Sequence, residues 1–149
     1  MTVVNEVTNE MKALAEFLGV DVNEVKQGDY DCQLYHEGSE YLVLTDEEAQ
    51  EQAEAEIKEG LWCLDTDFIF EHISACSKIS RPAIEKIKSA FSEVQDSYCE
   101  SLNELIEVMV DDVNKLIEDV IESDGRGRFI AKYDGIENEH NGFYIYCVD

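Results

Sequence analysis

The residues best able to do chemistry in this sequence are carboxylates at helical spacing. Thirty residues from Glu93 to Glu122 contain no glycine or proline, which predicts one continuous helix about 45 Å long. At 100° per residue, eight acids fall within about 40° of one line along this helix. These acids are Glu93, Asp96, Glu100, Glu104, Glu107, Asp111, Glu118 and Glu122. Such a row can attract cations or a basic protein surface by its fixed negative charge.

The row has the sign of a nucleic acid but a lower charge density. It offers one charge every ~5–6 Å, whereas duplex DNA offers one every ~1.7 Å. A second array would be needed to imitate a duplex, and Glu47, Glu48, Glu51 and Glu54 can supply it. The other interpretation is that a very acidic protein has acidic helices, and the row is then only a solvated face.

The segment "DGRG", residues 124–127, is a second candidate site. The segment contains Arg126 and is followed directly by Arg128. These are two of the three arginines in the chain. A phosphate-binding loop needs a strand before its glycines and a helix after them, and here the expected order is reversed. The segment therefore predicts a helix end and connector, with Gly125 and Gly127 at positive φ. Its arginines are expected to contact helix carbonyls or the acidic row.

Known catalytic patterns are absent from the sequence. There is no GxSxG, HExxH or GxxxxGK[ST] motif. Asp65 and Asp67 could together bind a divalent ion, but Asp65 also suits the N-cap of a short helix. No catalytic residue, cofactor or resident metal is expected, and the chain is predicted not to be an enzyme.

The composition limits the partners. The 149 residues include 35 Asp and Glu against 11 Lys and Arg, for a net charge of −24, yet 44% are hydrophobic. Nucleic acid is therefore an unsuitable direct ligand, and cations, basic proteins or nucleic-acid-binding proteins are better candidates. The oligomeric state is not readable.

The five cysteines form no CxxC pair and lie in apolar runs. They predict buried free thiols in a reducing cytoplasm. The sequence shows neither a signal peptide nor a segment of the ~20 apolar residues that cross a bilayer.

The order of expected elements is helix, hairpin, helices, hairpin. Apolar spacing predicts a first helix from Val4 to Leu18. A hairpin follows over 32–45, and Thr45 with Glu48 predicts a capping box that opens a helix over 46–59. Trp62 is expected to anchor the core, and Asp65 and Ser80 to cap two later helices. The basic residues between these caps and beyond, Lys78, Arg81, Lys86 and Lys88, are interpreted as partners for nearby acids.

A second hairpin is expected to join 129–133 to 143–147 through a long acidic loop. The prediction is one α+β domain over residues 1–149. Its two hairpins can share one small antiparallel sheet, packed by the long amphipathic helix and shorter helices.

Three segments resemble a widespread group of small acidic phage and prophage proteins. They are "YLVLTDEEA" (41–49), "SDGRGRFIAKYDG" (123–135) and "FYIY" (143–146). The group has no established activity or site residues, so the resemblance implies only a phage or prophage origin. Small acidic phage proteins often inhibit host defence, and some are DNA mimics that block restriction or CRISPR effectors.

Three functions are therefore open. The leading hypothesis is a non-enzymatic inhibitor, in the cytoplasm of an infected or lysogenic bacterium, that binds the positively charged nucleic-acid site of a CRISPR or restriction protein. The alternative is a phage accessory or structural interaction protein whose acidity serves solubility. A third is a divalent-metal-dependent hydrolase that uses clustered carboxylates.

Overall fold

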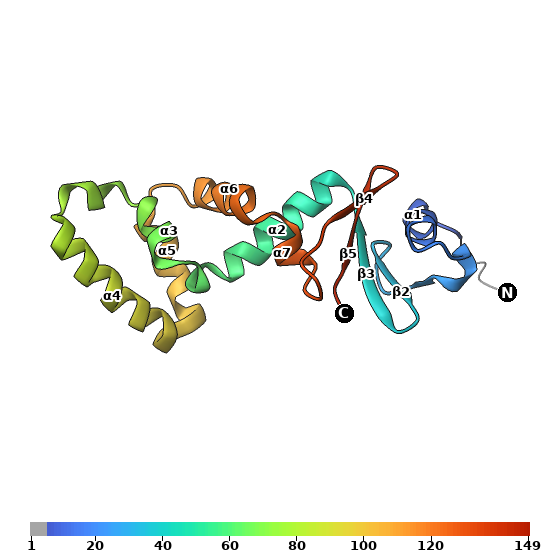
Figure 1. Cartoon of the computed structure of the whole chain (residues 1–149), viewed down its shortest axis with the longest axis horizontal. Coiled ribbons are helices and arrows are strands. Elements are labelled where there is room, and N and C mark those ends of the chain that lie inside the picture. The colour runs from blue at the N-terminus through green and yellow to red at the C-terminus, as the bar shows by residue number, and fades with distance from the viewer. Residues whose placement is uncertain (1–5) are drawn as a thin grey trace. The chain divides into compact units, whose positions relative to one another are not determined.

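A computed structural model describes residues 6–149, and its fold is α+β (Figure 1). The chain divides into two compact units. The first combines the residues up to Ala53 with Gly125–Asp149, and the second is Glu54–Asp124. The expectation of a single domain over 1–149 stays a prediction.

The first unit contains one five-stranded sheet of order β1-β2-β3-β5-β4, in which every neighbouring pair is antiparallel. Its strands are β1 (Lys26–Gln27), β2 (Gln33–His36), β3 (Ser39–Leu44), β4 (Asn138–His140) and β5 (Phe143–Cys147). The predicted sharing of one sheet by the two hairpins is confirmed. Val43 of β3 lies opposite Ile145 of β5, which places the centre of the sheet in the core.

The first helix packs on this sheet. Helix α1 (Asn9–Leu18) begins after Thr8, whose Oγ1 accepts a 3.1 Å hydrogen bond from Met11 N, and ends at Gly19 with φ 70°. A 3₁₀ turn, η1 (Val22–Glu24), follows. Leu14 of α1 joins the sheet residues in the core of this unit. The predicted helix is confirmed from Asn9 to Leu18. Residues 6–8, which the prediction includes, are not helical, and its expected beginning at Val4 lies outside the described residues.

The expected strand over 129–133 is wrong. Residues Gly127–Ile130 form a short helix, α7, and the partner of β5 is β4. Asn141 and Gly142 have φ of 51° and 81°, a pair that favours a two-residue hairpin turn. This turn brings the residues immediately before it into register with β5. Both edges of β5 are therefore paired, with β3 and with β4, and residues 129–133 contribute a single backbone hydrogen bond to its end, from Tyr133 N to Cys147 O at 3.4 Å, rather than a strand.

Helix α2 (Asp46–Glu59) has the predicted bounds. Glu48 N donates to Thr45 Oγ1 at 3.2 Å, and Thr45 N donates to Glu48 Oε1 at 3.0 Å, which confirms the capping box. Its narrow apolar stripe, Ala49, Ala53 and Ile57, is fully buried.

The second unit is helical. Its elements after α2 are η2 (Leu61–Cys63), α3 (Thr66–Glu71), η3 (Ser74–Lys78), α4 (Arg81–Tyr98), η4 (Cys99–Leu102), α5 (Asn103–Met109) and α6 (Val113–Asp124). Asp65 accepts hydrogen bonds from Asp67 N and Phe68 N, so its predicted capping role is confirmed. Ser80 stands at the N-cap of α4 without a side-chain cap bond, and Pro82 lies in the first turn.

The expected continuous helix over 93–122 is wrong. Cys99 has φ 48°, which no α-helix accommodates, and Val110 is extended. Asp112 then caps the next helix by accepting hydrogen bonds from Asn114 N and Lys115 N. The breaks let separate segments bury their own apolar faces, with Leu102 and Ile106 before the second break and Leu116 and Val120 after it.

Two polar side chains hold the segments of this unit together. Gln95 is buried, donates from Nε2 to the carbonyls of Trp62 and Leu64 at 2.9 Å, and accepts from Thr66 Oγ1 at 2.6 Å. Asn103 donates to Glu59 O and accepts from Trp62 N. Trp62 itself is only half-buried, so it contributes less to the core than expected. Within residues 6–149, no helix is both long and apolar enough to cross a membrane.

Candidate binding surface

The eight acids of the expected row lie in one unit but not on one helix. Glu93 and Asp96 are on α4, and Glu100 is in η4. Glu104 and Glu107 are on α5, and Asp111 follows α5. Glu118 and Glu122 are on α6. The helix breaks described above rotate each segment separately. The single line of charge is therefore wrong, and several short acidic segments take its place.

Six of these acids are exposed and have no ion pair among the residues that the structure describes. They are Glu93, Asp96, Glu100, Glu104, Glu118 and Glu122. The nearby lysines are engaged with other acids: Lys115 pairs with Asp119 at 2.7 Å, and Lys58 with Glu107 at 3.5 Å. These six carboxylates face solvent and can accept hydrogen bonds from a basic partner.

The other two acids of the row already have partners within the fold. Asp111 accepts from both the backbone N and the Oγ of Ser74, at 2.9 and 3.0 Å, and so fastens the start of η3. Glu107 takes part in the pair with Lys58. Substitution of these two residues would change stability as well as charge.

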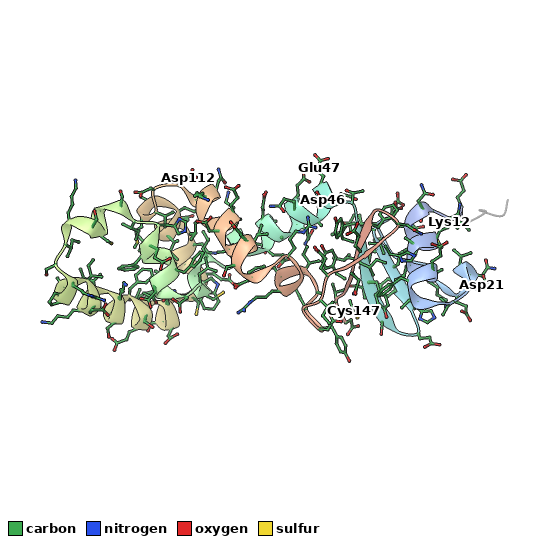
Figure 2. All side chains as sticks on the ribbon, turned by 45° about the horizontal axis from the view of Figure 1, so that its top comes forward. Lys12, Asp21, Asp46, Glu47, Asp112 and Cys147 are labelled. Carbon is green, nitrogen blue, oxygen red and sulfur yellow. The ribbon has the colours of Figure 1, made fainter. Side chains whose placement is uncertain are left out.

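The expected second array lies along α2. Glu47, Glu51 and Glu54 are exposed at positions i, i+4 and i+7, which share one face of a helix. Glu48 belongs to the capping box. Figure 2 shows Asp46 and Glu47 at the start of α2 and Asp112 in the other unit, before α6.

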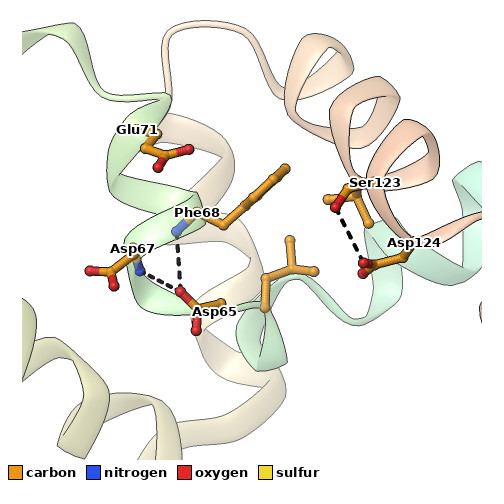
Figure 3. Close-up of a pocket in the computed structure, with 8 residues that line it drawn as sticks. Asp65, Asp67, Phe68, Glu71, Ser123 and Asp124 are labelled. Carbon is orange, nitrogen blue, oxygen red and sulfur yellow. Dashed lines mark hydrogen bonds between the residues drawn. The ribbon is translucent and has the colours of Figure 1, made fainter.

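A hollow of about 300 Å³ lies within the second unit. Leu64, Phe68 and Val120 give it apolar walls, and acids stand at its edge: Asp65, Asp67, Glu71 and Asp124. Figure 3 shows the Phe68 ring extending towards Ser123 and Asp124, whereas Asp67 points away from them. An apolar wall with carboxylates at its edge suits the aliphatic stem and charged head of a basic side chain.

Asp65 and Asp67 do not act together. Asp65 serves the cap of α3, and Asp67 pairs with Lys88 at 3.1 Å. The pairing of Lys88 agrees with the expected role of the basic segment. Among residues 6–149, no three His, Cys, Asp or Glu side chains converge in a way that could hold a metal ion.

The "DGRG" segment builds a polar cluster in the first unit. Arg126 Nη1 donates to Asp46 Oδ1 at 2.8 Å and to Asp46 O at 3.1 Å, while Nε donates to Glu137 Oε1 at 2.8 Å. The guanidinium also lies 4.6 Å from the centre of the Tyr144 ring. Burial lowers the pKa of Arg126, but the hydrogen bonds to Glu137 and Asp46 outweigh it and raise the pKa overall. Arg126 therefore contacts a helix carbonyl, at the first residue of α2 rather than at the end of α6, and no acid of the expected row.

The two glycines of "DGRG" differ. Gly125 follows α6 with φ 81°, as predicted. Gly127 does not have positive φ. It is buried in α7, where an added Cβ would lie 2.6 Å from Gly135 O and 2.9 Å from Glu137 N. Close backbone packing, rather than a special dihedral angle, requires glycine at this position.

All five cysteines are free, as predicted, although none is fully buried and Cys63 is exposed. The partial exposure corrects the expectation of buried thiols. Burial, followed by the Glu48 carboxylate, raises the pKa of the Cys32 thiol.

Comparisons with protein-family models, curated proteins and solved structures find no match for this chain. Its most distinctive chemistry is the set of exposed carboxylates on α4, η4, α5 and α6.

Proposed function

We propose that this chain is a non-enzymatic acidic protein that binds the positively charged nucleic-acid site of a bacterial defence protein, such as a CRISPR or restriction component. The observation that carries the proposal is the set of six exposed acids without ion pairs, named above, in the second unit. Their charges are available to arginines and lysines that otherwise contact phosphates.

The charge of the whole chain supports the same proposal. A net charge of −24 on 149 residues repels nucleic acid and favours rapid association with a basic surface. The six acids lie on four segments of one unit rather than along one line. The three segments that resemble small acidic phage and prophage proteins add support of a weaker kind, by analogy of class.

The first experiment identifies the target. The immobilised protein is incubated with bacterial lysate, and bound proteins are eluted with duplex DNA, with RNA, or with stepwise salt. We expect one nucleic-acid-binding protein to elute with nucleic acid and with moderate salt. The proposal would be contradicted by a captured protein that neither DNA nor RNA elutes but that detergent releases.

A second candidate function is an interaction protein that binds through apolar side chains. Leu105 and Val108 of α5 are 48% and 82% exposed, and large apolar side chains are enriched at protein interfaces. The variant Val108→Ser would then weaken partner capture, whereas it leaves capture unchanged if the carboxylates carry the binding. Acidity in this case serves solubility alone.

A further inference from the structure

Helix α4 has one face packed in its own unit and a second apolar face left open. Phe91 and Gln95 point inward and are 9% and 7% exposed. On the neighbouring side of the helix, Ile87 is 44% exposed and Tyr98 is 62% exposed. Both faces carry apolar side chains, but only the face of Phe91 and Gln95 is buried against other residues of the unit.

The open face has the spacing of a helix-pairing seam. Ala83, Ile87, Ala90 and Val94 follow one another at intervals of four, three and four residues, and all four are at least partly exposed. This is the alternation of the d and a positions in a heptad. Alanine at each d position leaves room for a second helix to approach closely. The face therefore fits another helix with an apolar seam of similar length.

Charge along the edge of this seam changes sign from one end to the other. Lys86 and Glu93 are seven residues apart, so they occupy equivalent positions beside the seam, and both are exposed without an ion pair among the described residues. Arg81, Glu85 and Asp96 lie on the opposite side of the helix, so Lys86 and Glu93 are the charges that flank the seam. A helix with this pattern complements a copy of itself that runs in the opposite direction, because each basic half meets an acidic half.

We propose that a second copy of this chain docks on α4 in antiparallel orientation and forms a two-fold symmetric dimer. Ile87 of each copy packs beside Ala90 of the other. Lys86 of each copy pairs with Glu93 of the other, and the two-fold axis creates this pair twice. The proposal concerns self-association and does not depend on the proposed inhibitory function.

The central test uses sedimentation velocity on the full chain, at about 0.3 M salt to screen the repulsion between two acidic copies. The variant Ile87→Lys introduces a charge into the seam. Its matched control is Ser89→Lys, an exposed position of α4 outside the seam, with the same change in net charge. We expect the wild type and Ser89→Lys to sediment as dimers and Ile87→Lys as a monomer. Loss of the dimer could not arise from added repulsion, since Ile87→Lys makes the chain less negative.

Exchanging the charges of Lys86 and Glu93 tests the antiparallel orientation. It also tests the dimer independently if the Ile87→Lys variant fails to fold. Lys86→Glu changes the net charge from −24 to −26, Glu93→Lys changes it to −22, and the double variant returns it to −24. Each single variant should weaken the dimer by about tenfold because like charges meet twice. The double variant should restore it. Far-UV circular dichroism monitors folding in every case.

Three results would overturn the proposal. The first is a wild type that stays monomeric at concentrations up to about 200 µM, which leaves only a negligible affinity. The second is a folded Ile87→Lys variant that is as dimeric as Ser89→Lys. The third is a double swap that fails to recover the affinity lost in both single variants.

Discussion

Arg126 and Glu137 form an ion pair in which Nε and Oε1 are 2.8 Å apart. The same carboxylate accepts a hydrogen bond from the Tyr146 hydroxyl. Because Arg126 also reaches Asp46 at the start of α2, one guanidinium connects three distant parts of the first unit. The Arg126 side chain is only 12% exposed and that of Glu137 31%, whereas that of Asp46 is 75% exposed, so the contact with Glu137 is the more sheltered of the two.

The first prediction is that Arg126→Ala destabilises the protein by about 2–3 kcal/mol, because it leaves Glu137 half-buried without its cation. Arg126→Lys should recover only part of this, since one ammonium cannot reproduce the fork that reaches both acids. Urea denaturation measures both values. Loss of target binding in Arg126→Ala with unchanged stability would instead make "DGRG" a binding site.

The second prediction compares the two glycines of "DGRG". Gly127→Ala should cost about 2–3 kcal/mol, because its Cβ would meet backbone atoms at 2.6 and 2.9 Å. Gly125→Ala should cost about 1 kcal/mol, because only its φ of 81° opposes a side chain and nothing lies within 4 Å. Thermal or urea unfolding of both variants gives the ranking. Equal costs, or the reverse order, would contradict this account of Gly127.

Much of the first unit could be predicted from local sequence. The Thr45 and Glu48 capping box, the stop at Gly19 and the first hairpin each follow from a few neighbouring residues. Local sequence does not reveal the breaks in the expected helix over 93–122, because Cys99 and Val110 are residue types that occur in ordinary helices. Their non-helical angles arise from tertiary packing, in which Leu102, Ile106 and Leu116 all have to be buried.

The polar contacts of the fold are hard to predict from the sequence for a different reason. Gln95 interrupts an apolar stripe of α4, which was a usable signal of a buried polar residue. Arg126 and Glu137 gave no such signal, since both lie in segments rich in charge and turn residues. Their pairing depends on the placement of β4 beside β5, and the expected strand over 129–133 excluded that placement. The exposure of the six unpaired acids could be predicted from their types, but their arrangement could not.

The third prediction concerns alkaline pH. Burial, and next the hydrogen bond to Glu137, raise the pKa of Tyr146 above its usual value of 10.0. The folded state therefore keeps a proton that the unfolded chain releases above pH ~10. This contribution to stability is complete below pH ~10 and is lost as the pH rises further.

The measurement is the free energy of unfolding between pH ~9 and ~11 for the wild type and Tyr146→Phe. The phenylalanine variant should be less stable at neutral pH by about 1–2 kcal/mol, because Glu137 loses a donor. Its stability should fall less steeply in the alkaline range. The other tyrosines and the lysines titrate in both proteins, so parallel curves would contradict the assignment to Tyr146.

The fourth prediction is that the folded protein contains five titratable thiols of unequal reactivity. Cys63 is exposed and should react first with a thiol reagent. Cys32 should react slowly, because burial and Glu48 raise its pKa and reduce its thiolate fraction. Alkylation followed by peptide mass analysis gives the order and the total. A native mass that shows disulfides would be incompatible with the structure.

The binding proposal depends most directly on the exposed acids, and reversing four of them to lysine tests it. The variant carries Glu100, Glu104, Glu118 and Glu122→Lys, which avoids Glu107 and Asp111 and their structural contacts. The control reverses Glu6, Glu37, Glu139 and Asp149, four exposed acids of the other unit. Four replacements of −1 by +1 take both variants from −24 to −16, so total charge is matched.

The decisive measurement is the affinity of wild type and both variants for the captured host protein, over a range of salt and with duplex DNA or RNA as competitor. We expect wild-type binding that weakens steeply with salt, near-complete loss of binding in the first variant and substantial retention of binding in the control. Both variants should stay folded, and reduced self-repulsion should stabilise them if it changes stability at all. Equal affinity of the two variants would show that these four acids are only a solvated face.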